Sequence, residues 1–358
     1  MGISLTATGI TFPDATTQTT AKYGSYRNRI INGNMSIAQR GTSFVSPATN
    51  TYTLDRWVYS NTTSGTVTIT QNVEQPNLLI SGAIYSPATP DIATSLKIEV
   101  TGADTAIATA DYANIAQRIE GYNISDLINT TFTISFNVRT SIAGPFCVSL
   151  RNEAGDVSYI LGYTQPTQDG FNTKWGRYSF VVNGGLPSTS TWNTSTGVGL
   201  RVEFTLASGS TYYVGNPEQW YTSTTGLALS NQTNLFATVG NTFEVTGVQV
   251  EKNTVLAPQY DLRADSIELA MCQRYYCRTG ASVRGYTTAA GQTMAGTVFF
   301  PQLMRAAPVC TKSVFSNLNI ATYDVTDITT EGARYGISSA AAGNMYSVYG
   351  TIVANSEI

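Results

Sequence analysis

Histidine is absent from the 358-residue sequence, which removes most of the side-chain chemistry that enzymes use near neutral pH. Ser-His and Cys-His nucleophiles, His-ligated metals and the commonest general base all need an imidazole. Carboxylates can still do acid–base chemistry, and a glycan-cleaving enzyme needs two of them about 5–10 Å apart. The glutamates that come into question for such a pair are Glu120, Glu203, Glu218 and Glu251.

The sequence context of these glutamates favours structural roles over catalysis. Glu203 falls on the polar face of an alternating strand, and Glu120 and Glu251 end strands. No EF-hand-like or other local metal-binding motif is present. We therefore expect no catalytic residues, no metal ligands, no cofactor and no enzymatic activity.

The cysteines do not suggest redox or zinc chemistry. Cys272 and Cys277 are five residues apart on an expected helix, which is poor geometry for a disulfide or a zinc knuckle. Cys147 and Cys310 lie far from them in the sequence. We expect all four to be small buried hydrophobes in a reducing compartment.

Aromatic residues in polar loops suggest carbohydrate binding, because the apolar C–H faces of sugars lie on aromatic rings while their hydroxyls bond to polar partners. Trp57 is different, since the alternation of its strand places it in the core. For each loop aromatic, packing beneath the loop is an equally good interpretation. The candidate carbohydrate-binding residues are Trp175, Trp192, Trp220, Tyr221, Tyr323, Tyr335, Tyr346 and Tyr349.

Composition narrows the classes of partner. Charged residues make up 12% of the chain, about half of the usual 25%, and 53 residues are threonine. The net charge is −3 without a basic run, which argues against a nucleic-acid or anionic-membrane partner. No uncharged apolar stretch is long enough to insert in a membrane, and the first residues lack the features of a signal peptide.

Alternating strands and turn-rich loops predict an all-β protein. In 131–139 and 197–206 apolar residues alternate with polar ones, so one face of each strand should be wet. Near Gly247 the alternation changes phase, which predicts a β-bulge there. Many such strands favour a large antiparallel jelly-roll sandwich over residues 26–264. Residues 280–358 also contain short β-type segments separated by loops, and they predict a small C-terminal β-sandwich tip.

One helix is expected between the two β modules, over 265–277 within a linker that spans 265–279. Asp265 is a candidate N-cap, and Glu268 completes a capping-box pattern. A helix this short is not stable alone. We therefore predict a homotrimer in which Ile267, Met271 and Tyr275 lie at the interface between copies.

A series of short motifs follows along the whole chain. These are 10–14 (ITFPD) with 16–20 (TTQTT), 28–35 (NRIINGNM), 39–41 (QRG), 55–57 (DRW), 117–121 (QRIEG), 247–251 (GVQVE), 268–276 (ELAMCQRYY), 304–308 (MRAAP) and 354–358 (ANSEI). In this order they resemble bacteriophage tail-fibre and related virion fibre proteins. The most specific match, 268–276, resembles the linker that follows the carbohydrate-binding-module-like jelly roll of these fibres.

The resemblance implies a non-enzymatic, trimeric virion protein, assembled in the host cytoplasm, that recognises a bacterial surface polysaccharide. It leaves a structural Ca²⁺ open, as well as attachment to a tail, an adaptor or the head. An architectural fibre or adaptor that joins virion parts is the alternative, and a glycan depolymerase is less favoured because β-helix periodicity is missing. Host contact is expected in the jelly-roll loops and the tip. The tip is slightly favoured, and its few charges predict little dependence on salt.

Only about 25 residues precede the expected jelly roll, and they lack a core of their own. We expect residues 1–25 to attach the protein to another virion protein by strand pairing. The apolar residues available for this anchor are Ile3, Leu5, Ile10 and Phe12.

Overall fold

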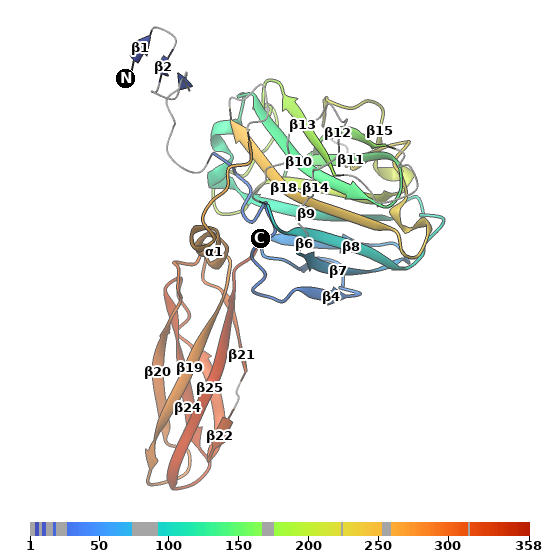
Figure 1. Ribbon diagram of the computed structural model, residues 1–358. Coiled ribbons are helices and arrows are strands. Elements are labelled where there is room, and N and C mark those ends of the chain that lie inside the picture. The colour runs from blue at the N-terminus through green and yellow to red at the C-terminus, as the bar shows by residue number, and fades with distance from the viewer. Residues whose placement is uncertain are drawn as a thin grey trace.

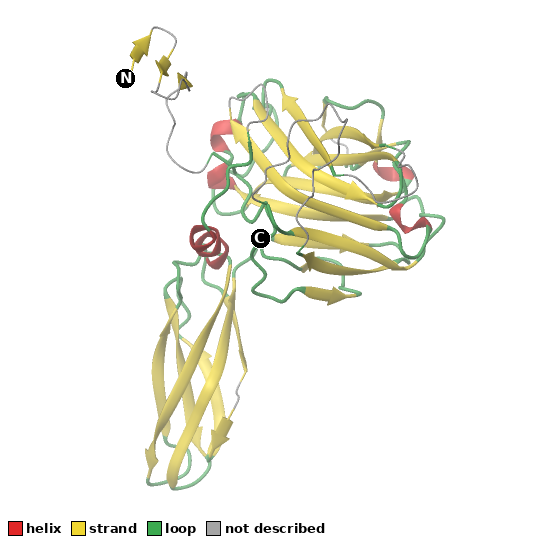
Figure 2. Cartoon of the chain, viewed as in Figure 1, coloured by secondary structure: helices red, strands yellow, loops and turns green. Residues whose placement is uncertain are grey.

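The computed structural model describes residues 27–73, 92–166, 175–222, 225–252, 259–313 and 316–358. It also gives the strands β1 (Ser4–Thr6), β2 (Gly9–Thr11) and β3 (Thr17–Gln18), whose side chains are not described. Across the described residues the chain is almost entirely β, with one α-helix between two sandwiches (Figure 1, Figure 2). The predicted all-β fold class is therefore confirmed.

The larger sandwich is a jelly roll built from a six-stranded and a seven-stranded sheet (Figure 1). The six-stranded sheet contains, in spatial order, β13 (Gly176–Val182), β10 (Phe132–Thr140), β18 (Thr242–Lys252), β8 (Ser95–Gly102), β7 (Thr66–Asn72) and β4 (Ser43–Val45). The seven-stranded sheet contains β16 (Trp220–Thr222), β12 (Val157–Gln165), β11 (Gly144–Arg151), β14 (Val198–Ser208), β9 (Tyr112–Glu120), β6 (Trp57–Asn61) and β5 (Thr51–Tyr52). All pairs within these two sheets are antiparallel.

The loops of the jelly roll contain several short elements. They are the 3₁₀ turns η1 (Gly121–Asn123), η2 (Ser125–Leu127), η3 (Ser210–Tyr212) and η4 (Leu235–Ala237), and the small parallel pair of β15 (Tyr213–Val214) and β17 (Ala228–Leu229). β15 and β17 lie over the outer side of the seven-stranded sheet, where Val214 and Ala228 pack on Cys147 and Ile160.

The core between the sheets follows the predicted alternation. Trp57 is fully buried there, as expected, and its indole Nε1 donates to the carbonyl oxygen of Asn32 at 3.0 Å. The predicted bulge is confirmed, because Gly247 and Val248 of β18 together oppose one residue of β10. Gly247 has a φ of +62°, a left-handed conformation that glycine adopts without a steric penalty.

The expected wet face of β10 is wrong. Thr133, Ser135 and Asn137 are all buried, because further segments cross the outer side of the six-stranded sheet. The amide of Asp261, for example, donates to the side-chain oxygen of Gln249 at 3.0 Å. Polar residues on this face therefore bond to other chain segments where the alternation predicts solvent.

The helix α1 (Asp265–Gln273) is confirmed, but its start and end differ from the prediction. Its N-cap is Ala264, without a side-chain cap, so the capping box does not form. Glu268 instead points into the jelly roll, where it accepts from the backbone amide of Asn32 and pairs with Arg263 at 3.1 Å. The helix ends before the expected 277 because Tyr276 already pairs with β25 as a strand residue.

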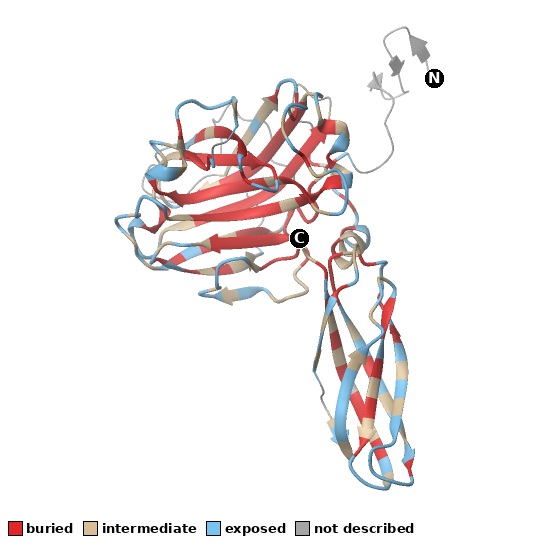
Figure 3. Cartoon of the chain, turned by 180° about the vertical axis from the view of Figure 1, so that it is seen from behind, coloured by how far each residue is buried: buried red, intermediate tan, exposed pale blue. Residues whose placement is uncertain are grey.

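The tip is an elongated sandwich of two sheets (Figure 1). One sheet contains β19 (Tyr276–Thr287), β25 (Gly343–Asn355), β21 (Val309–Ser313) and β22 (Ser316–Leu318), and the other contains β20 (Thr293–Phe299), β24 (Gly332–Ser339) and β23 (Ile320–Thr326). Figure 3 shows burial running along the jelly-roll strands but alternating along the tip strands. The tip therefore has a thin core, which includes Tyr335, Ile337 and Ile352.

The jelly roll, the helix and the tip meet in a buried polar network. Glu357 pairs with Arg40 at 3.1 Å and with Arg56, whose guanidinium lies 3.6 Å from the ring centroid of Tyr275. Tyr275 in turn donates to Glu120 at 2.8 Å. Segments from four parts of the sequence are fixed together by these contacts.

The last strand, β25, runs back from the far end of the tip to this junction (Figure 1). The backbone oxygen of Ile358 accepts hydrogen bonds there from Tyr52 and, at 2.9 Å, from Arg118. Turns around Ala289, Asn319 and Ala341 form the far end instead, and hydrogen bonds join them to neighbouring strands. Ile358 therefore lies beside the jelly roll and not at the far end of the tip.

Replacing Glu268 with alanine should destabilise the protein by about 3–5 kcal/mol, because Arg263 is then left buried without its carboxylate partner. Urea unfolding followed by tryptophan fluorescence measures the loss. The matched control is Glu99→Ala, which removes an exposed pair with Lys97 and should cost about 0–1 kcal/mol. Equal effects of the two substitutions would contradict a stabilising role for the junction.

Candidate functional site

The four candidate glutamates lie apart from one another. Glu203 is buried and pairs with Arg151 at 2.9 Å, and Glu120 is buried at the junction beside Arg274. In the strand register Glu203 lies opposite a residue of β9 four positions from Glu120, which separates their Cα atoms by at least about 13 Å. Each of the two carboxylates is paired with a different arginine.

The other two glutamates lie elsewhere in the jelly roll. Glu251 is in the opposite sheet, where burial raises its pKa and Arg27, 3.6 Å away, counteracts the rise. Glu218 is exposed in a loop. These four glutamates therefore do not form a pair of catalytic carboxylates.

Two of the candidate loop tryptophans pack inside the jelly roll. Trp192 is 9% exposed, and its indole Nε1 donates to Pro187 at 2.9 Å. Its ring meets that of Trp220 edge-on at 5.6 Å, and Trp220 donates to Gly185 at 3.0 Å. The expectation that Trp192 binds sugar is therefore wrong, because neighbouring protein groups occupy its ring and its N–H. Trp220 is partly buried against the same core.

Trp175 and Tyr221 are partly buried as well. The ring of Trp175 lies under the guanidinium of Arg139, with 5.1 Å between the carbon Cζ and the ring centroid. The hydroxyl of Tyr221 accepts from the amide of Asn216 at 2.8 Å and so fixes its own loop. Both side chains thus contact neighbouring protein groups, and their part in sugar binding stays a prediction.

The tip tyrosines do not form one surface. Tyr335 is 1% exposed, and its hydroxyl bonds to Ser347 at 2.6 Å, so the prediction that it binds a glycan is wrong. Tyr323 is 38% exposed on β23, whereas the half-buried Tyr346 belongs to the other sheet. Tyr349 lies in β25, and its side chain is outside the described residues.

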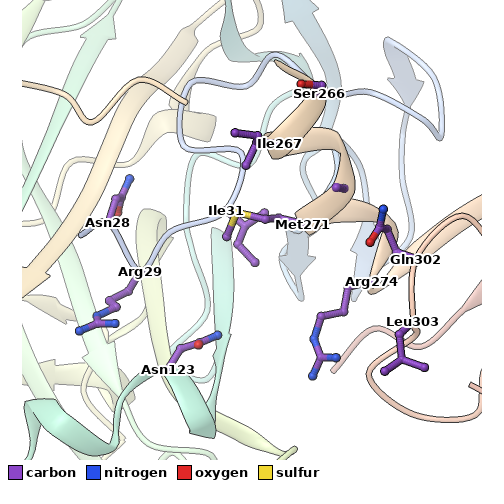
Figure 4. A pocket seen from close by; sticks show the side chains of 11 residues that line it. Asn28, Arg29, Ile31, Asn123, Ser266, Ile267, Met271, Arg274, Gln302 and Leu303 are labelled. Carbon is purple, nitrogen blue, oxygen red and sulfur yellow. The ribbon is translucent and has the colours of Figure 1, made fainter. Parts of the chain in front are cut away.

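The predicted trimer residues separate into two groups. Tyr275 is buried within one chain at the junction, so its place in an interface between copies is wrong. Ile267 and Met271 line an open hollow of about 680 Å³, together with Ile31 and Leu303. Figure 4 shows that this lining comes from the helix, the jelly roll and the tip. The apolar part of the hollow is the surface to which the trimer prediction now applies.

The predicted virion anchor is outside what the structure describes. Ile3 and Phe12 are not described, and Leu5 and Ile10 are known only as opposite backbone positions in the β1–β2 pair. The anchor therefore stays a prediction.

A polar groove of about 170 Å³ lies on the outer face of the seven-stranded sheet, opposite the core. Its floor holds a row of arginines across three adjacent strands, since Arg201 of β14 lies opposite Arg118 of β9 on one side and Arg151 of β11 on the other. Like charges directly opposite one another destabilise a sheet. Glu203 is the one acidic residue among those that line the groove.

The hydrogen bonds of the row leave its charge largely uncompensated by side chains. Arg151 pairs with Glu203, but Arg201 donates to the backbone oxygen of Glu153 at 2.6 Å. Arg118 donates to the side-chain oxygen of Asn50 at 3.1 Å and to the backbone of Ile358. The Nε of Arg201 is buried and makes no hydrogen bond with the described residues.

The neighbouring positive charges also affect the pKa of the central arginine. Burial lowers the pKa of Arg201, Glu203 raises it, and the charges of Arg151 and Arg118 lower it further. Burial and the neighbouring arginines therefore disfavour the positive charge of Arg201.

The walls of the groove offer aromatic and neutral polar groups. The rings of Tyr112 and Tyr212 meet edge-on with 5.2 Å between their centroids, and both line the groove. The amide of Asn114 is in the lining too and makes no hydrogen bond with the described residues. Groups of this kind bind hydroxyls and the C–H faces of a sugar ring.

The sequence holds a partial signal for this groove. Arg201 and Glu203 occupy the polar phase of 197–206, and Arg118 and Arg151 occupy outward positions of their strands. Their alignment depends on strand order, which periodicity does not give. The sequence alone therefore does not predict the groove.

The structure can be compared with known proteins at low identity only. It is similar to the tailspike protein 4 enzymatically active domain of bacteriophage CBA120, with 16% identity, a TM-score of 0.32 and cover of 63% of this chain and 22% of that one. It is also similar to the family 11 carbohydrate-binding module of a Clostridium thermocellum cellulosomal cellulase, with 10% identity, a TM-score of 0.29 and cover of 58% and 95%. A third structure, TmCBM61 in complex with β-1,4-galactotriose, has 8% identity, a TM-score of 0.29 and cover of 64% and 100%.

The neighbours therefore include carbohydrate-binding modules and a phage tailspike domain, and the chain covers about a fifth of the tailspike domain's length. These likenesses are too distant to assign a ligand or an activity. No protein-family model and no curated protein matches the chain.

The described residues contain no group of three or more cysteines, aspartates or glutamates arranged to hold a metal ion. The described helix is too short to cross a membrane.

Replacing Arg201 with glutamine should raise the free energy of unfolding of the free protein by about 0.2–1 kcal/mol, because it relieves repulsion within the row. The gain should shrink as salt is added, since salt screens the repulsion. Urea unfolding at low and high ionic strength measures both effects. Arg278→Gln is the matched control, because Arg278 is exposed and lies opposite Val353. A destabilised Arg201→Gln protein would show that the row is not repulsive.

Proposed function

We propose that the protein is a bacteriophage virion fibre protein that binds a host cell-surface glycan during adsorption, as a homotrimer and without cleaving the glycan. The observation that carries the glycan-binding part is the groove, where two tyrosine rings and an unpartnered amide stand beside a row of hydrogen-bond donors. A groove of this make-up suits a ligand with many hydroxyls.

The fibre part of the proposal rests on the sequence motifs. Residues from three of these motifs meet at the junction between the jelly roll, the helix and the tip. Asn32, Arg56 and Glu268 come from three different motifs, and all three take part in the junction. The motifs that resemble phage fibres thus include the contacts that join the jelly roll, the helix and the tip. This supports the same arrangement of modules in the present chain.

The site proposed for host contact differs from the one that sequence alone favoured. Tip tyrosines are buried or divided between two sheets, whereas the jelly roll offers a groove with converging polar groups. We therefore place glycan contact in the jelly roll. Residues 1–25 are proposed to join the protein to another virion protein, and the virion is proposed as its location.

Absence of turnover is part of the proposal. The chain has no histidine, and its buried glutamates each have an arginine partner in a different place. This arrangement supports the proposal of binding without cleavage.

The trimer is supported by the hollow beside α1. Cys272 of the helix, and Tyr275 just after it, pack on Ile31 and Ile37 of the same chain. Ile267 remains 36% exposed and Leu303 57% exposed at the hollow. We propose that neighbouring copies cover this surface. Three linked sites would raise the avidity of weak sugar binding.

Replacing Ile267 with aspartate should therefore convert the trimer to a monomer, because the charge would be buried between copies. Light scattering at micromolar concentration gives the mass of each variant. Val45→Asp is the control, since Val45 is 75% exposed on β4 and should tolerate the charge. A monomeric mass for the unaltered protein would overturn the trimer.

Incubation with purified host surface polysaccharide should give binding without new reducing ends. The double variant Tyr112→Ala/Tyr212→Ala should weaken binding at least tenfold, whereas Tyr323→Ala/Tyr346→Ala should leave it unchanged, and thermal unfolding verifies that both variants fold. New reducing ends that disappear in Glu203→Gln would contradict the non-enzymatic proposal. Failure to bind any glycan, with stoichiometric binding to a virion protein instead, would favour the architectural alternative.

A further inference from the structure

The arginine row suggests which class of glycan the groove takes. Within the lining, Arg118, Arg151 and Arg201 face a single carboxylate, that of Glu203. A neutral sugar would leave this excess of positive charge in place. An oxyanion bound above the row would offset it.

We infer that the groove binds an acidic glycan, with the anionic group of one sugar residue placed over Arg201. This inference rests on the proposed glycan-binding function and specifies its ligand. The planar guanidinium matches a carboxylate, sulfate or phosphate group through two parallel hydrogen bonds. Arg201 is the central arginine of the row and is partly exposed.

The surroundings of Arg201 suit such a contact. Arg151 is already held by Glu203 at 2.9 Å and by the backbone oxygen of Gly155 at 3.3 Å, so it fixes one side of the row. Arg118 lies on the other side, and its side-chain partner, Asn50, is neutral. The groove is narrow, with room for about six waters at about 30 Å³ each. Charge interactions of partly buried groups such as these are stronger than in open water.

The neutral parts of the lining are placed for the rest of the sugar. The Asn114 amide can donate to and accept from ring hydroxyls, and the Tyr112 ring offers an apolar face. Asn114 and Arg118 occupy the same outward face of β9, four residues apart. One ligand can therefore contact a charged group at one end of the groove and neutral groups at the other.

The test compares an acidic glycan with its neutral, carboxyl-reduced form and with a sulfated glycan of a different backbone. Polygalacturonate, its carboxyl-reduced form and dextran sulfate are titrated into the full-length protein by calorimetry. We expect the carboxyl-reduced polymer to bind at least tenfold more weakly than polygalacturonate. Stronger binding of dextran sulfate would identify a sulfate-type group as the preferred oxyanion. Binding should weaken with added salt, unlike the little salt dependence expected of the tip.

Substitutions locate the effect. Arg201→Gln should abolish the preference for the acidic polymer, and Arg201→Lys should retain part of it, because lysine keeps the charge without the planar fork. Arg278→Gln, an exposed arginine of the tip, should change nothing. Equal binding of polygalacturonate by Arg201→Gln and the unaltered protein would overturn the inference.

A monosaccharide pair separates failure of this inference from failure of the proposed function. The Nε–H resonance of Arg201 should shift with methyl glucuronide and not with methyl glucoside. A shift with both sugars, or binding of host polysaccharide that does not change in Arg201→Gln, would overturn the acidic preference while glycan binding stands. If neither sugar shifts the resonance and no polysaccharide binds, the proposed function and this inference both fail.

Discussion

Buried charges at the junction of the two sandwiches must be paired, and much of the rest of the structure depends on this requirement. Each unpaired ion removed from water costs several kcal/mol. Arg56 is buried, and its carboxylate partner, Glu357, is 301 residues away in the sequence. Arg263 is buried as well, and it pairs with Glu268 of the helix that follows it. Neither sandwich contains the full set of partners. The pairing requirement therefore fixes how the tip is oriented on the jelly roll.

The groove follows the opposite rule. Three arginines occupy adjacent strands and share one acidic neighbour in the lining, although repulsion opposes that arrangement. Junction and groove are neighbours, since Arg118 lines the groove and also holds the backbone of Ile358. The junction, where charges are paired, thus lies next to a groove whose positive charge is available to a ligand. Sites of this kind commonly cost stability in the free protein.

Aromatic loop residues illustrate why residue type and local context can mislead. Trp192 and Trp220 stand in polar segments, yet they pack on each other and donate their indole N–H groups to nearby carbonyls. A large ring in a loop stabilises the protein more by burial than by exposure. Trp192 lies in the segment before β14 and Trp220 begins the edge strand β16, and both rings pack against the core of the sandwich.

The sequence by itself determined the all-β class, the core position of Trp57, the bulge at Gly247 and the existence of the helix, because each depends on local periodicity or on one backbone conformation. Only the tertiary structure decided which polar residues are exposed to solvent. Glu268 looked like a helix cap, but a bond to Asn32 and a pair with Arg263 compete for its carboxylate. The arginine row likewise exists only once β9, β14 and β11 are neighbours. Strand order is set by packing between distant segments, and a period of two along one strand carries no information about it.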